Sequence, residues 1–446
     1  MISTTESSVR VSPNDVHDHL RGHILVDGFP LVMDLEKSQG AYLYDSLRGR
    51  ALLDLFTCFS TCPLGYNHPQ LDTPEFRERI LPAALNKPAN SDLYTTQMAE
   101  FVDTFARTLP TALNQRLFFI SGGALAVENT LKAAFDWKVR KNMAAGKGEK
   151  GSQVIHFQQA FHGRSGYTLS LTNTADPKKY QYFPRFDWPR VSNPHLRFPV
   201  TPQILEEVEA AEARALDEIK QALTDNPDDI AALLIEPIQG EGGDNHFRRE
   251  FLQQLRELAD EAEFLLAFDE VQTGFGTTGK WWAFEHFDVI PDLLAFGKKA
   301  QVCGICASSR LDEIDSVFKV SSRINSTWGG NLADMVRSQR YVEIIESEDL
   351  LTNATEVGGH ILAGFHKLAE LYPGKVTNGR GRGMFVAFDL PDGETRDLTL
   401  KAMLDADVLG LASGERSIRF RPSLALTQGE ADEGLDRLTR ALATLL

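Results

Sequence analysis

Three short stretches, each at the end of an apolar run, contain the residues that could carry out chemistry. They are Lys298 in DLLAFGKK, Asp269 in FLLAFDEVQTG and the turn at 121–124 in RLFFISGGALAVEN. A lysine amine can form a Schiff base with an aldehyde cofactor. A carboxylate can keep a pyridine nitrogen protonated, and a turn of small residues that opens a helix can hold a phosphate. Together, the three stretches predict a site for pyridoxal 5'-phosphate (PLP).

The candidate lysine has a neighbour that competes with it. Lys298 follows a glycine at the end of an apolar run, but Lys299 comes directly after it, and the pattern does not say which side chain turns inward. Asp269 ends a run that is typical of a fully buried strand, where a carboxylate needs a cationic or donor partner. A protonated pyridine nitrogen would be such a partner.

Other residues near these stretches could complete a cofactor site. Gln272 and Val271, on the turn after Asp269, could bond the ring oxygen and cover one face of the ring. Phe161 could stack on the other face. A buried aromatic residue is more often plain core, so this hypothesis depends on its neighbours.

The elements that must position these residues alternate between strand and helix. The sequence predicts strands at 117–120, 154–157, 230–235, 264–268 and 293–296, with helices at about 204–223 and 251–262. This alternation predicts an α/β fold with a mainly parallel sheet. In such sheets, ligands bind beyond the carboxyl ends of the strands. Five candidate residues lie just after predicted strands: Gly123, Phe161, Glu241, Asp269 and Lys298.

The C-terminal part shows two further local patterns. The glycines at 379–383 (GRGRG) predict a flexible turn into a strand at 384–390. Thr427 and Glu430 form a capping-box pattern that opens a helix ending at about residue 445. From the length of the chain we expect one large domain and a smaller partner. The expected boundaries are an N-terminal segment of the small domain at 1–60, the PLP-binding domain at 61–334 and the C-terminal small domain at 335–446.

Composition and charge exclude several classes of function. The 446 residues carry a net charge of −16, which speaks against nucleic acid or an anionic membrane as the main partner. Cys303 and Cys306 have the spacing of a redox or zinc site, but no further ligands are spaced for a metal, so we expect none. The polar N-terminus at 1–15 and the small number of cysteines predict a soluble, cytoplasmic protein.

Nearly the whole chain resembles the class III (ω-amino acid) family of PLP-dependent aminotransferases. The motifs match in order and spacing: FHG at 161–163, EPIQGEGG at 236–243, DEVQTG at 269–274 and GK at 297–298. The resemblance implies PLP fold type I, with a smaller α+β domain beside the large one. It also implies that Lys298 is the Schiff-base lysine and that Gly123 and Ala124 bind the phosphate.

Longer stretches resemble the branch of this family that acts on the terminal amine of L-lysine. They include ALNKP at 84–88, HGRSGYTLSLTN at 162–173 and NSTWGGN at 325–331. This implies transfer of the ε-amino group to 2-oxoglutarate, which gives L-glutamate and 2-aminoadipate 6-semialdehyde, an aldehyde that cyclises. It also implies a homodimer in which Thr327 reaches the partner subunit's phosphate.

The two substrates of such an enzyme need different anchors. Arg164 is the candidate for the distant carboxylate, because a guanidinium binds a carboxylate through two hydrogen bonds. The family motif implies that Arg419 is the near anchor and that Glu241 masks it until 2-oxoglutarate or glutamate arrives. Arg421 is the alternative if Arg419 points outward. The nearest other hypothesis is an ω-aminotransferase for ornithine, 4-aminobutyrate or a diamine. A PLP mutase, racemase or decarboxylase and a non-catalytic PLP-binding regulator are more distant alternatives.

Overall fold

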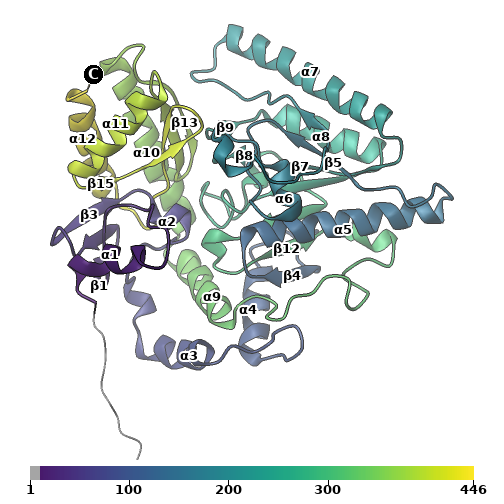
Figure 1. Cartoon of the computed structure of the whole chain (residues 1–446), viewed down its shortest axis with the longest axis horizontal. Coiled ribbons are helices and arrows are strands. Elements are labelled where there is room, and N and C mark those ends of the chain that lie inside the picture. The colour runs from purple at the N-terminus through teal and green to yellow at the C-terminus, as the bar shows by residue number, and fades with distance from the viewer. Residues whose placement is uncertain (1–10, 446) are drawn as a thin grey trace, which may run out of the picture.

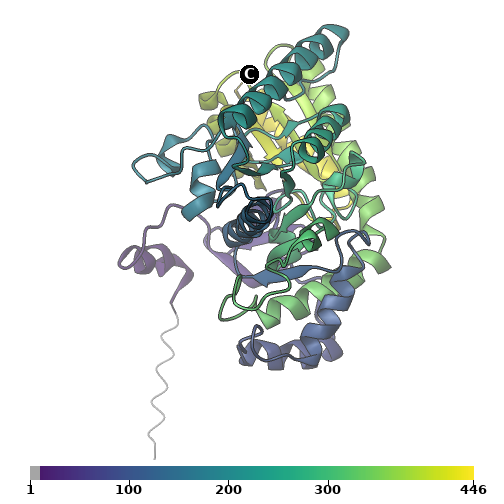
Figure 2. The same cartoon turned by 90° about the vertical axis from the view of Figure 1, so that its right-hand side faces the viewer.

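The computed structural model describes residues 11–445 of the chain. The predicted polar N-terminus therefore lies partly outside the described residues. Within them, Figure 2 shows α1 (Val16–Arg21), in purple, standing off the body of the molecule. None of the helices among residues 11–445 is long and apolar enough to cross a membrane.

A seven-stranded sheet forms the centre of the large domain, in the order β4-β12-β11-β10-β7-β5-β6. Its strands are β4 (Leu117–Ile120), β5 (Gln153–Phe157), β6 (Arg190–Val191), β7 (Ile230–Ile235), β10 (Leu265–Asp269), β11 (Leu293–Phe296) and β12 (Cys303–Ala307). The pairs β11–β10, β10–β7, β7–β5 and β5–β6 are parallel, and β12 is antiparallel to both of its neighbours. The predicted α/β fold with a mainly parallel sheet is confirmed.

The central strands are apolar because helices cover both faces of the sheet. Every residue of β7 and of β10 is buried, as expected for strands without a solvent face. Figure 1 shows α5 crossing in front of the sheet, with α7 and α8 lying above it. The helices of this part are α3 (Pro74–Leu85), α4 (Thr96–Ala106), α5 (Gly123–Ala144), α6 (Gly166–Leu171), α7 (Pro202–Asp225) and α8 (Arg249–Glu261).

The N-terminal strands join a strand from the far end of the chain. β1 (Met33–Gln39), β2 (Tyr42–Asp45) and β3 (Arg50–Asp54) form an antiparallel meander, and β15 (Val408–Leu409) pairs with β3 in parallel. In Figure 1 the purple N-terminal strands accordingly lie beside the yellow C-terminal elements. The pairing joins the two ends of the chain in one sheet. The assignment of the N-terminal segment to the small domain and the domain boundaries stay a prediction.

The C-terminal part contains a second antiparallel sheet, in the order β13-β14-β17-β16. Its elements are α9 (Leu332–Ser347), α10 (Leu350–Leu371), β13 (Thr377–Arg382), β14 (Phe385–Asp389), α11 (Gly393–Asp405), β16 (Leu411–Ser413), β17 (Ser417–Phe420) and α12 (Gln428–Ala443). The capping box of α12 is confirmed, because Thr427 Oγ1 accepts from the Glu430 amide and Glu430 Oε2 accepts from the Thr427 amide.

The predicted flexible turn at 379–383 is wrong, because most of this segment is strand β13. Arg380 is buried in the strand, where it forms an ion pair with Asp389 at 2.8 Å. Glycine suits the strand because a Cβ at position 381 would lie 2.6 Å from Val386 Cγ1. The glycines in this segment therefore allow close packing of the strand and do not form a flexible turn.

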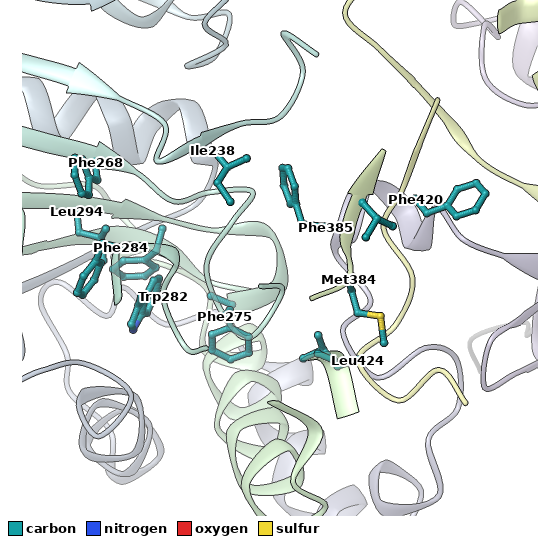
Figure 3. Packing of buried hydrophobic residues seen from close by; sticks show 14 of the residues in the cluster. Ile238, Phe268, Phe275, Trp282, Phe284, Leu294, Met384, Phe385, Phe420 and Leu424 are labelled. Atoms are coloured by element: carbon teal, nitrogen blue, oxygen red, sulfur yellow. The ribbon is translucent and has the colours of Figure 1, made fainter. Parts of the chain in front are cut away.

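One continuous core joins the large domain to the C-terminal sheet. Figure 3 shows Phe275 and Trp282 on one side and Met384, Phe385 and Leu424 on the other. Gly383 allows the approach, because a Cβ there would lie 2.5 Å from the carbonyl carbon of Thr278. A close-packed core resists deformation, so it fixes β17 in relation to the large sheet.

Candidate active site

A cavity of about 520 Å³ opens at the carboxyl edge of the large sheet. β4 runs in the same direction as β11, since both are antiparallel to β12, and the loops after β4, β5, β10 and β11 therefore meet at this edge. The lining residues are Thr61, Gly123, Ala124, Phe161, His162, Gly163, Arg164, Glu236, Asp269, Val271, Gln272, Lys298, Gln301 and Cys303. Eight of them are predicted site residues, and of the five residues expected to cluster at strand ends all but Glu241 line the cavity.

Asp269 lies at the end of β10, and its carboxylate is held by two donors. The Val271 amide donates to Oδ1 at 3.1 Å, and His162 Nδ1 lies 2.8 Å from Oδ2. Asp269 is 5% exposed and the His162 side chain is fully buried. An ionised carboxylate has acceptor sites beyond these two bonds. Asp269 can therefore still accept a bond from a cationic group in the cavity.

His162 is a site residue that appeared in the sequence only within the motifs at 161–163 and 162–173. Its ring orients the Asp269 carboxylate. Its position next to Phe161 was the signal that could have identified it.

Glu236 lines the cavity and accepts hydrogen bonds from two of the segments around it. Its two oxygens accept from the Phe161 amide at 3.0 Å and from the Gly240 amide at 2.9 Å. Burial raises the pKa of this carboxyl to about 7, although the nearby His162 acts in the opposite direction. The residue thus links the loop that carries Phe161 to the turn that carries Glu241.

The structure separates the two neighbouring lysines. Lys298 has a left-handed backbone, with φ of 49°, and lines the cavity. Lys299 is buried away from it and donates to Ser60 Oγ. Burial, followed by the charges of Arg419 and Arg421, lowers the pKa of Lys298 to about 8. Its amine is therefore closer to neutral at physiological pH than an ordinary lysine amine is.

The turn after β4 leads into a helix of 22 residues whose N-terminus lines the cavity. α5 begins at Gly123, its N-cap Gly122 has φ of 114°, and no side chain caps its first amides. A Cβ at position 123 would lie 3.0 Å from Val271 Cγ1, so glycine allows Val271 and this turn to meet. Uncapped amides at a helix N-terminus favour an anion such as a phosphate.

Arg419 and Glu241 lie next to the cavity and form an ion pair. Arg419 Nη2 lies 3.0 Å from Glu241 Oε2, and Arg419 Nη1 donates to Gln272 Oε1 at 3.3 Å. The Arg419 side chain is only 3% exposed, which rules out the outward orientation. The alternative anchor Arg421 pairs instead with Asp244, and both side chains are buried. Arg419 is therefore the arginine that faces the site through Gln272.

The other two predicted residues lie at the periphery. Arg164 is exposed and lines both the main cavity and an adjoining one of about 440 Å³. Thr327 is exposed and does not line the main cavity. Its carbonyl accepts from Ser91 Oγ at 3.3 Å. The main cavity of one chain therefore includes Arg164 but not Thr327.

The chemistry of the lining residues fits PLP. The cavity holds a half-buried primary amine and a buried carboxylate, which are the groups that an aldehyde and a pyridine nitrogen require. Uncapped amides at the start of α5 suit the phosphate, and Phe161 and Val271 are apolar groups beside them. Within residues 11–445, no group of acidic, histidine or cysteine side chains is arranged to hold a metal ion. Burial raises the pKa of the Cys303 thiol, which favours its neutral form.

The fold and the site define a known class of enzyme. The family model for class III aminotransferases matches residues 26–442, and the chain belongs to this family. Enzymes of this class use PLP.

Individual relatives match over almost their full length. The L-lysine-epsilon aminotransferase of Amycolatopsis lactamdurans is 50% identical over 433 residues, covering 96% of each chain. The structure of the lysine aminotransferase from M. tuberculosis in the internal aldimine form is 49% identical, with a TM-score of 0.95, and the match covers 98% of this chain and 100% of that one. The 4-aminobutyrate aminotransferase of Sus scrofa is 32% identical over 431 residues, covering 92% of this chain and 84% of that one.

Proposed function

We propose that this class III aminotransferase moves the ε-amino group of L-lysine to 2-oxoglutarate. The products would be L-glutamate and 2-aminoadipate 6-semialdehyde, which cyclises to piperideine-6-carboxylate because its free α-amine reaches the aldehyde. The observation that carries the proposal is the 50% identity, over nearly the whole length, to a protein named for this activity. The 32% identity to a 4-aminobutyrate aminotransferase supports that alternative less.

When PLP is bound, it supplies an aldehyde for the substrate amine and a ring that accepts electrons. Lys298 would hold it through its amine, and Asp269, positioned by His162, would stabilise the protonated ring nitrogen. Gly123 and Ala124 would bind the phosphate, Gln272 would bind the ring oxygen, and Phe161 and Val271 would cover the ring. Each assignment is supported by the place of the residue on the cavity wall.

Lys298 would also move the proton in the reaction. When its amine is free, Lys298 would act as the general base that takes a proton from the ε-carbon of lysine and as the general acid that delivers it to the former aldehyde carbon of the cofactor. A general base works best when its pKa lies near the working pH, and burial lowers the pKa of Lys298 to about 8.

Substrate choice would depend on two arginines. Arg164, at the rim, anchors the carboxylate far from the cofactor for both substrates. Arg419 anchors the near carboxylate of 2-oxoglutarate or glutamate, and Glu241 neutralises it while the methylene chain of lysine lies beside it. For a dicarboxylate, the Glu241 side chain swings away and Arg419 is exposed.

The proposed unit is a homodimer in the cytoplasm, with Thr327 reaching the phosphate of the partner subunit. Large apolar side chains near the proposed active site are solvent-exposed in the single chain. They include Phe59 beside Lys298 and Trp328 beside Thr327. Burying such side chains favours association. The four free thiols support a reducing compartment.

The proposal is tested by mixing the PLP-loaded protein separately with L-lysine, L-ornithine, 4-aminobutyrate and L-glutamate while the cofactor absorbance is followed. We expect rapid spectral change with lysine and glutamate only, and a cyclic imine from lysine. Reaction with glutamate and a different ω-amine, but not lysine, would contradict the proposed substrate. A dimer mass in solution is the corresponding test of the homodimer.

A further inference from the structure

The carboxylate of Glu241 contacts two cations from different parts of the chain. Oε2 pairs with Arg419 on β17, and Oε1 accepts from Lys179 Nζ. Lys179 ends the short 3-10 turn Pro177–Lys179, in the loop between α6 and β6. Lys179 lies outside the sequence motifs at 161–163, 236–243, 269–274 and 297–298. One carboxylate is thus divided between a buried arginine and a lysine nearer the surface, whose side chains are 3% and 25% exposed.

The backbone around Glu241 is fixed. The Gly240 amide donates to Glu236 Oε2 at 2.9 Å, and the Glu241 carbonyl accepts from the Gly414 amide at 2.9 Å. A Cβ at position 242 would lie 1.9 Å from the Gln159 carbonyl oxygen, so the turn is tightly packed. Rotation of the Glu241 side chain, without movement of its backbone, can therefore separate it from Arg419.

We propose that Lys179 is a positioning residue that holds the Glu241 carboxylate when it releases Arg419. The inference rests on the proposed exchange of two substrates in one site. When Arg419 turns to a substrate carboxylate, Glu241 keeps a cationic partner in Lys179 and does not lose both ion pairs. Lys179 thereby lowers the free energy of the open state, which only dicarboxylate substrates require.

Direct contact with the substrate is a competing role for Lys179. Lys179 and Arg164 both line the adjoining cavity, together with Phe183. A lysine there could bind the distant carboxylate of a substrate. That carboxylate is present in both L-lysine and 2-oxoglutarate, so removing such a contact would weaken the binding of both substrates equally. A support for Glu241, in contrast, affects only the dicarboxylates.

The test is Lys179→Met, with the half-reactions of L-lysine and L-glutamate measured on the PLP form of the enzyme and that of 2-oxoglutarate on the pyridoxamine phosphate form, each by stopped-flow absorbance. A partly exposed ion pair corresponds to roughly a fivefold change in affinity. We expect the half-saturating concentrations of glutamate and 2-oxoglutarate to rise about fivefold, with maximal rates and the lysine half-reaction unchanged. Lys179→Arg restores the wild-type values, and Lys178→Met, at the exposed neighbouring position, leaves them unaltered.

A double-mutant cycle adds a readout that general damage would not produce. In a Glu241→Gln background, Lys179→Met has no further effect on glutamate, because the charge that Lys179 holds is gone. An equal loss for lysine and glutamate, or no change for either, overturns the inference. Failure of the wild-type enzyme to use lysine overturns the proposed substrate instead. The comparison is then made with whichever ω-amine reacts.

Discussion

Replacement of Glu241 by glutamine should change the balance between the two substrates rather than abolish activity. Glutamine keeps the size of the side chain but removes the charge that neutralises Arg419, 3.0 Å away. The methylene chain of lysine would then lie beside an uncompensated guanidinium. Glutamate and 2-oxoglutarate, in contrast, would no longer have to displace a paired carboxylate.

The size of this effect follows from the geometry of the pair. Two unit charges about 4 Å apart attract by about 4 kcal/mol at an effective dielectric constant near 20. Glu241 is 22% exposed, and solvent screening together with ordering of the side chain reduces this to about 1–2 kcal/mol. The cost to lysine and the gain to glutamate both lower the ratio of the kcat/KM value for lysine to that for glutamate. We therefore expect the lysine-to-glutamate ratio to fall about 10- to 100-fold.

The assay is the single-turnover half-reaction of each amino acid with the PLP-loaded enzyme, analysed for kcat and KM. Glu257→Gln, an exposed position on α8, is the matched control. A ratio that stays at the wild-type value would refute the masking role. An equal fall in both half-reactions would show that Glu241 supports the site as a whole and not the choice between substrates.

Two further predictions concern the groups that face the cofactor. His162→Leu removes the 2.8 Å bond to Asp269, so both half-reactions should slow about tenfold while PLP still binds, and His162→Gln should recover part of the rate in stopped-flow measurements. Burial lowers the pKa of Lys298 from 10.5 to about 8. Between those values the unfolded chain binds a proton that the native chain lacks. The free energy of unfolding of the cofactor-free protein should therefore rise as pH increases through this window, and the gain is lost as pH falls. Lys298→Met should remove up to about 3 kcal/mol of this dependence in urea titrations at pH 7.5 and 10. An identical slope in both proteins would contradict the proposed burial of the amine.

Much of the site could be predicted from the sequence because its residues follow apolar strands directly. The position of Asp269 after β10 and of Lys298 after β11 is a local feature, and parallel strands bring such positions to one edge. Arg419 could be placed only through a family motif, because β17 reaches the cavity by packing of the C-terminal sheet.

What the sequence did not indicate depends on contacts between distant segments. Lys179 belongs to an irregular loop, and its ion pair with Glu241 joins residues 62 positions apart. Lys298 lines the cavity whereas Lys299 donates to Ser60 Oγ, and this difference is a property of tertiary packing. The segment at 379–383 was misinterpreted because glycine indicates close packing as well as turns.

The most direct measurement uses L-lysine labelled with ¹⁵N at the ε-position only, incubated with the PLP-loaded enzyme and 2-oxoglutarate. Mass spectrometry of the glutamate formed shows which nitrogen was transferred. We predict that every glutamate formed from this lysine carries the label and that the carbon product is the cyclic imine. Unlabelled glutamate would mean that the α-amine is transferred, which would contradict the central claim.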